Sequence, residues 1–139
     1  MMAKLLAFSI NAKAGLAFTK GLSSVEEPDI WIRSLDEQTS LWIDVGEPSP
    51  DRIKKASRQA GEVKVYSFNS KSDIWWEQGR SKFAMLKVSV FRFDSQSVKA
   101  FTALVERTMD LSITITGDSA FIATDSGECE VAWEPLQVV

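Results

Sequence analysis

Two aspartates lie at the ends of two short segments that alternate in hydrophobicity. Asp29 opens the segment 29–32 (DIWI), and Asp44 lies near the end of the segment 41–45 (LWIDV). Alternation at every second residue is typical of β-strands. The polar stretch 33–40 between them suits a hairpin connection, so the two segments are expected to pair antiparallel.

One register accounts for the residues of both segments. It places aliphatic residues opposite aliphatic residues and tryptophan opposite tryptophan, in the pairs Ile30–Ile43, Ile32–Leu41 and Trp31–Trp42. Directly opposed residues share a face of the sheet, so the aliphatic side chains are expected on one face and the tryptophans on the other. The same register sets Asp29 opposite Asp44 on the tryptophan face.

The two opposed carboxylates allow three interpretations. Like charges on neighbouring strands are destabilising, and they push the pKa of one carboxyl group up unless a cation relieves them. Asp29 and Asp44 could bind a divalent metal ion, share a proton, or, with the register shifted, end their strands in solvent. The chain has no histidine, which excludes His-based triads and the usual zinc sites. A metal would therefore be held by oxygen atoms, which favours Mg²⁺, Mn²⁺ or Ca²⁺.

A basic helix is predicted directly after Asp44. Ser49 is the expected N-cap, Pro50 the first helical residue and Gly61 the residue that ends the helix. Small and apolar residues at helical spacing predict a buried stripe of Ile53, Ala56, Ser57 and Ala60. Outside that stripe lie Arg52, Lys54, Lys55, Arg58 and Gln59. This polar face is either simply exposed to solvent, or it begins near the two carboxylates and brings cationic groups to them.

Several motifs, in order along most of the chain, resemble the YaeQ family. They are EPDIW (27–31), LWIDVG (41–46), RIKKA (52–56), VYSFNS (65–70), WW (75–76) and RTM (107–109). The resemblance implies a fold similar to that of the PD-(D/E)XK nucleases, with a rearranged active-site motif.

The resemblance also implies a site. By position, Asp29 and Asp44 resemble the two acidic elements of the nuclease motif, which would bind Mg²⁺ or Mn²⁺. Lys55, or less readily Lys54, would supply the cation from the following helix. Gln59, one helical turn after Lys55, would orient the substrate.

Two functions follow from this resemblance. A metal-dependent nuclease would use Mg²⁺ to lower the pKa of a bound water, and Lys55 to stabilise the charge that develops on the phosphate. The alternative is a catalytically inactive nuclease fold that serves as a binding or regulatory protein. Gly46, which stands where the motif has its lysine, favours the alternative. So does the expected absence of a family N-terminal segment of about forty residues. Nucleic acid is the partner that the resemblance suggests.

Composition is that of an ordinary globular domain. The 139 residues, 45% hydrophobic and 25% charged, predict a single α/β domain over 1–139 with a mixed sheet flanked by helices. The net charge of −3 gives no global attraction for nucleic acid, so such binding would need a local basic patch. Cys129 is the only cysteine, which fits a reducing compartment and a packing role. No apolar run is long enough to span a membrane, so a cytoplasmic location is expected.

The remaining segments predict further helices and strands. Helices are expected over 1–14, from a Ser72–Asp73 cap through Trp75 and Trp76, and from an Asp94–Ser95 cap to about 109. Strands are expected over 16–19, 62–68, 85–93, 111–116, 120–124 and 128–133. The strand–helix–strand order around 41–68 implies a parallel crossover. Residues 135–139 are expected to be a frayed tail.

Overall fold

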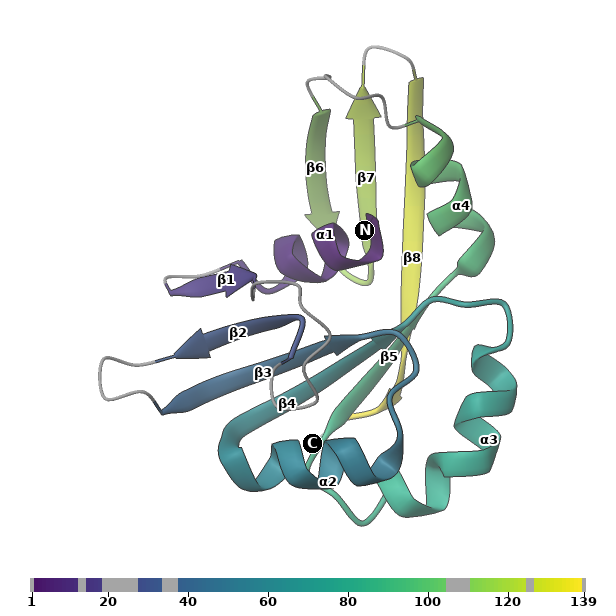
Figure 1. Cartoon of the computed structure of the whole chain (residues 1–139). Helices are drawn as coiled ribbons and strands as arrows, with labels where there is room; N and C mark the ends of the chain where they lie inside the picture. The colour runs from purple at the N-terminus through teal and green to yellow at the C-terminus, as the bar shows by residue number, and fades with distance from the viewer. Residues whose placement is uncertain are drawn as a thin grey trace.

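A computed structural model gives the arrangement of these elements (Figure 1). It describes residues 2–12, 15–18, 28–33, 38–104, 111–124 and 127–138. The helices are α1 (Met2–Ile10), α2 (Pro50–Gln59), α3 (Ser72–Phe83) and α4 (Ser95–Leu104). The strands are β1 (Leu16–Phe18), β2 (Ile30–Arg33), β3 (Thr39–Val45), β4 (Ala60–Ser67), β5 (Ser89–Phe93), β6 (Leu111–Thr116), β7 (Ser119–Thr124) and β8 (Gly127–Gln137). No helix in the described ranges is both long and apolar enough to cross a membrane.

The described strands form one mixed sheet in the order β1-β2-β3-β4-β5-β8-β7-β6. Its centre is parallel, because β3, β4 and β5 run in the same direction, and both flanks are antiparallel. The long strand β8 joins the two halves: its first residues pair with β7 and its last residues pair with β5. Figure 1 shows β8 running from the β6–β7 hairpin down into the lower sheet. The expected α/β fold with a mixed sheet is confirmed.

The predicted register of the first hairpin is confirmed. Ile30 pairs with Ile43, Trp31 with Trp42 and Ile32 with Leu41. The two faces also separate as expected, because Leu41 and Ile43 belong to one hydrophobic core and Trp42 to another.

The two cores are covered by different helices. The aliphatic face of the hairpin packs with α1 and α4, which contribute Leu6 and Phe101. The tryptophan face packs with α2 and α3, which contribute Ile53 and Phe83. The chain therefore leaves β3 and β4 through helices on one face of the sheet, and leaves β5 through α4 on the other.

The helix after Asp44 begins as predicted but ends differently. The Ser49 hydroxyl accepts a hydrogen bond from the Arg52 backbone N–H at 3.2 Å, and Ile53 and Ala56 are buried. The expectation that Gly61 ends the helix is wrong. Helix α2 ends at Gln59 and β4 begins at Ala60, so Gly61 lies inside a strand. A side chain there would meet the Ser40 carbonyl oxygen at 3.3 Å from its Cβ, so glycine permits the close approach of β3 and β4.

The expectation that 135–139 is a frayed tail is also wrong. Strand β8 continues to Gln137, and Pro135 pairs with Phe91 of β5. The register shifts between Val90 and Phe91, so the proline lies next to a bulge, where a missing N–H is tolerated. In the sequence the proline suggests that the strand has ended, but in the structure it lies at an irregularity within the strand.

Two further boundaries differ from expectation. The strand expected over 85–93 begins only at Ser89, and Met85 is 86% exposed. Helix α3 is longer than expected and starts at Ser72 itself, with Lys71 at the N-cap position and no side-chain cap. Trp75 and Trp76 are both half-buried. The Trp76 ring stacks on Phe83, and the Trp75 ring packs against Phe83 at a tilt of 55°. The predicted end of α4 near Met109 lies outside the described residues.

Gln137 anchors the end of β8 to the connection between α3 and β5. Its Nε2 donates to the carbonyl oxygens of Phe83 at 2.8 Å, Val88 at 2.9 Å and Leu86 at 3.4 Å. We expect Gln137→Ala to lower the free energy of unfolding by about 1–3 kcal/mol, because partly buried carbonyl groups lose their donor. Urea unfolding of the variant and of Val138→Ala, whose exposed side chain is the control, measures this. Equal stability of both variants would contradict the anchoring role.

Candidate functional site

Asp44 is the buried charged residue around which the site is built. It lies on β3 two residues after Trp42, so both side chains face α2. It is 3% exposed, and it is the one charged side chain among the described residues that is buried to this extent. Burying a charged carboxylate is costly unless a cation or several hydrogen bonds compensate for the lost solvation.

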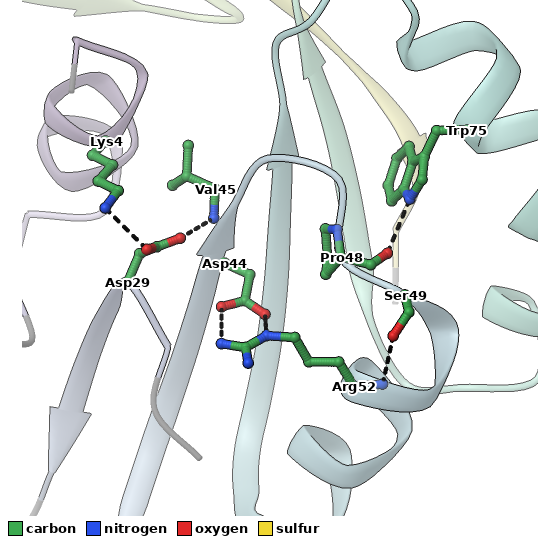
Figure 2. A network of polar contacts seen from close by, with 8 residues as sticks. All are labelled: Lys4, Asp29, Asp44, Val45, Pro48, Ser49, Arg52 and Trp75. Carbon is green, nitrogen blue, oxygen red and sulfur yellow. Dashed lines mark hydrogen bonds and ion pairs between the residues drawn. The ribbon is translucent and has the colours of Figure 1, made fainter. Parts of the chain in front are cut away.

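Arg52, in the first turn of α2, supplies both. Its Nε donates to Asp44 Oδ2 at 2.9 Å and its Nη2 donates to Asp44 Oδ1 at 3.3 Å, so the pair is bidentate (Figure 2). The hydrogen bond with Asp44 raises the pKa of the Arg52 guanidinium, with further support from the charges of Asp44 and Asp29, although burial opposes the shift. The guanidinium also lies 5.7 Å from the centre of the Trp42 ring.

Asp29 is neutralised separately. Its Oδ2 accepts a hydrogen bond from the Val45 backbone N–H at 2.8 Å, and its Oδ1 lies 3.1 Å from the Lys4 ammonium of α1 (Figure 2). The Asp29 N–H donates to the Ile43 carbonyl oxygen at 3.1 Å, so the residue extends the β2–β3 pairing beyond β2. The expectation that both carboxylates share the tryptophan face is not confirmed. Lys4 meets Asp29 from α1, the helix that covers the aliphatic face, whereas Arg52 meets Asp44 from α2, the helix that covers the tryptophan face. Each aspartate therefore has its own cation, from a different side of the sheet.

A pocket of about 420 Å³ lies beside this ion pair, between β3 and α2. Its lining consists of Trp42, Ser49, Asp51, Arg52, Lys55, Ala56 and Gln59. The predicted residues Lys55 and Gln59 therefore share a pocket with Arg52, whereas Asp29, Asp44 and Lys54 are not part of its lining.

Trp42 gives this pocket a specific polar feature. The residue is 3% exposed, and its Nε1–H is buried with no acceptor among the described residues. Buried donors nearly always have a partner, so an unpaired indole N–H is an unusual feature of a residue that lines a pocket.

Gly46 explains why the motif's lysine has no place directly after β3. Its φ of 127° lies in the region that favours glycine, and its N–H donates to the Tyr66 carbonyl oxygen at 2.8 Å. A lysine at this position would strain the backbone. Among the described residues, the cations nearest the site come from the helices: Arg52 and Lys55 from α2, and Lys4 from α1.

Sequence reasoning missed four residues of this neighbourhood. The sequence predicts Arg52 on the polar helix face that begins near the carboxylates but does not identify it as the partner of Asp44, although its place in the first turn after Asp44 is a usable signal. Trp42 was treated as packing alone. Lys4 comes from a distant helix and leaves no local signal. Glu47, directly after the strand, has a buried Oε1 without a partner among the described residues.

The carboxylates as arranged do not fit a metal ion. Both oxygens of Asp44 accept from Arg52, and both oxygens of Asp29 are engaged by Val45 and Lys4. Within the described ranges no group of three or more acidic or cysteine side chains is arranged so that it could hold a metal ion. Metal binding at Asp29 and Asp44 would first require Arg52 to leave a bidentate, largely buried pair.

Comparison with known proteins agrees with the motifs. The family described as "YaeQ protein" matches residues 1–133. The chain belongs to the YaeQ family. It is 37% identical to "Uncharacterized protein YaeQ" of Escherichia coli K12 and 36% identical to that of Salmonella typhi, with 96% of this chain and 77% of each relative covered.

Solved structures of the YaeQ family share the architecture. The crystal structure of the YaeQ protein from Xanthomonas axonopodis pv. citri superposes with a TM-score of 0.93 at 30% identity, covering 99% of this chain and 79% of that one. The protein from Pseudomonas syringae gives a TM-score of 0.91 at 28% identity, covering 100% and 78%.

The Asp44–Arg52 pair should be important for stability. We expect Arg52→Met to lower the free energy of unfolding by about 3 kcal/mol, because it leaves a buried carboxylate without its cation. Arg58→Met, an exposed arginine of the same helix, is the control and should change it little. The double variant Asp44→Leu/Arg52→Met should recover much of the loss, since an apolar pair can replace a buried ion pair. A double variant no more stable than Arg52→Met would show that the loss is not due to an unpaired charge.

Proposed function

We propose that this YaeQ protein is a binding protein whose pocket between β3 and α2 takes an anionic oxygen group, the phosphodiester of a nucleic acid. The supporting observation is the unpaired Nε1–H of Trp42 in the wall of a pocket that also presents Arg52, Lys55 and Gln59. Indole, guanidinium, ammonium and amide groups all donate hydrogen bonds, and phosphate oxygens are acceptors only.

The arrangement of charge supports binding in preference to hydrolysis. The guanidinium of Arg52 is held rigidly by Asp44 and stacked near Trp42, so its direction is set before any ligand arrives. Lys55 is exposed and one turn further along the same helix, where a flexible point charge can meet a phosphate. This favours the inactive nuclease-like fold over the active one.

Metal-dependent cleavage of phosphodiesters is the second candidate. It is favoured by the position of Asp29 and Asp44 at neighbouring strand ends, and by Lys55 and Gln59 in the adjacent pocket, as the resemblance to PD-(D/E)XK nucleases implies. It requires Arg52 to release Asp44 so that Mg²⁺ or Mn²⁺ can bind. No part of the binding proposal depends on that release.

Binding is tested with labelled single- and double-stranded DNA and RNA by fluorescence anisotropy over a series of salt concentrations. We expect Lys55→Ala to weaken binding for every sequence and to reduce the slope of log K against log salt by about 1, because one phosphate contact is lost. Lys54→Ala, an exposed lysine outside the pocket, is the matched control and should bind as the wild type does. Equal affinities for the two variants would refute the pocket as the binding site.

Hydrolysis is tested with the same oligonucleotides in Mg²⁺ or Mn²⁺, beside Asp29→Ala. We expect no cleavage beyond that of the Asp29→Ala control. We also expect Mg²⁺ to raise the melting temperature of Arg52→Met more than that of the wild type, since only the variant leaves Asp44 uncompensated. Cleavage by the wild type that disappears in Asp29→Ala and Lys55→Ala would replace the binding proposal with the nuclease.

A further inference from the structure

A second pocket, of about 530 Å³, lies where the carboxyl ends of β4 and β5 meet. Its lining comes from the segments after these strands, the starts of α3 and α4, and the adjoining part of β8: Asn69, Ser70, Ser72, Asp73, Arg92, Phe93, Asp94, Ser95, Ala132, Trp133 and Glu134. Helix α3 leaves β4 on one face of the sheet and α4 leaves β5 on the other. Neighbouring parallel strands whose connections leave on opposite faces form a switch point, the usual place for a ligand in α/β sheets.

The buried hydroxyl of Ser72, in the lining of this pocket, has no role in packing or capping within the described part of the protein. It is the first residue of α3, it is 1% exposed, and its Oγ has no hydrogen-bond partner among the described residues. A serine at a helix start normally uses its hydroxyl to cap the helix, but this hydroxyl caps nothing. An unpaired buried hydroxyl in a pocket wall can donate to a ligand and accept from it.

The charged groups that line the pocket are mostly acidic. The Arg92 guanidinium pairs with Asp73 and with Glu134. The Asp94 carboxylate caps α4 by accepting from the Ser97 N–H at 3.1 Å. Three carboxylates against one guanidinium disfavour an anionic ligand. The two helix starts, which carry partial positive charge, disfavour a bare cation.

A neutral ligand with many hydroxyl groups meets these conditions. Carboxylates of Asp73 and Glu134 can accept from ligand hydroxyls, and the hydroxyls of Ser70 and Ser72 can donate to ligand oxygens. Phe93 and Trp133, whose rings pack edge to face at 6.0 Å, add an apolar surface to the wall. Small-molecule sites commonly combine such aromatic walls with a few converging polar groups.

We propose that the pocket between α3 and α4 binds a sugar, either as a free monosaccharide or as the ribose of a nucleoside, with the Ser72 hydroxyl as a direct contact. This pocket is separate from the one between β3 and α2, so a sugar site here does not depend on phosphodiester binding there.

The test is a two-dimensional ¹H–¹⁵N NMR titration of the full chain with D-ribose and, separately, with adenosine. We expect shifts concentrated at residues 69–73 and 92–95. Ser72→Ala should raise the dissociation constant about fivefold, the effect of one lost hydrogen bond, without lowering the melting temperature, because an unpaired hydroxyl has been removed. Ser81→Ala, an exposed serine of the same helix outside the pocket, is the control and should alter neither quantity.

Further ligands distinguish a free monosaccharide from a nucleoside, and a neutral ligand from a charged one. Binding of both ribose and adenosine supports a sugar site, and a large gain for adenosine identifies a nucleoside. Glu134→Gln, at an exposed ion pair, should also weaken binding while leaving the fold intact. Tighter binding of ribose 5-phosphate or of spermidine than of ribose would overturn the proposal in favour of a charged ligand. Absence of localised shifts, or a Ser72→Ala variant that binds unchanged, would also overturn it.

Discussion

The buried ion pair between Asp44 and Arg52 sets the geometry on which the candidate site depends. Burying the Asp44 carboxylate near the end of β3 costs free energy unless a cation contacts it directly. Arg52 can do so only if α2 begins close to the end of β3 and in one rotational setting. The Ser49 cap and Pro50 at the first helical position provide that start. Lys55 and Gln59, at i+3 and i+7 from Arg52, are then placed along the same side of the helix.

A second contact holds the same connection from the other side. Trp75 of α3 donates from its Nε1 to the Pro48 carbonyl oxygen at 2.9 Å (Figure 2). The loop that carries α2 away from β3 is therefore fixed at Asp44 by an ion pair and at Pro48 by a neighbouring helix. A pocket built on such a loop can hold its donors in place without a ligand, which reduces the ordering cost of binding.

The features of the fold and site that the sequence predicts are those that depend on residues close together in the chain. The β2–β3 register depends on side chains that are close in sequence and complementary in type, and it was predicted pair by pair. The start of α2 is signalled by Ser49 and Pro50 alone. The relief of charge at Asp29 and Asp44 was also anticipated, but its source was not. Lys4 reaches Asp29 from α1, and nothing in the sequence near either residue indicates that approach.

Longer-range constraints account for the remaining errors. Pro135 suggests a chain end when only its own preferences are considered, yet it pairs with Phe91 of β5 beside a register shift, where a residue without an N–H is accommodated. Gly61 suggests a helix stop, yet the neighbouring β3 backbone is what requires a residue without a side chain. In both cases the residue type does mark an unusual backbone position. What makes the position unusual is a neighbouring strand that only folding brings close.

The unpaired polar atoms show where the fold departs from the rule that buried groups are satisfied. Among the described residues, the buried side-chain atoms without partners belong to Trp42, Glu47 and Ser72. Glu47 and Ser72 lie in the segments that follow β3 and β4, at the edge where the parallel strands end, whereas Trp42 lies in the middle of β3. Each such atom costs about 1–3 kcal/mol in desolvation that the folded chain alone does not recover. Errors of packing would be expected to scatter over both cores. The position of the Glu47 and Ser72 atoms at the edge where α/β sheets bind ligands, and of the Trp42 atom in a residue that lines a pocket, favours a functional origin, because a ligand is the partner that would satisfy such atoms.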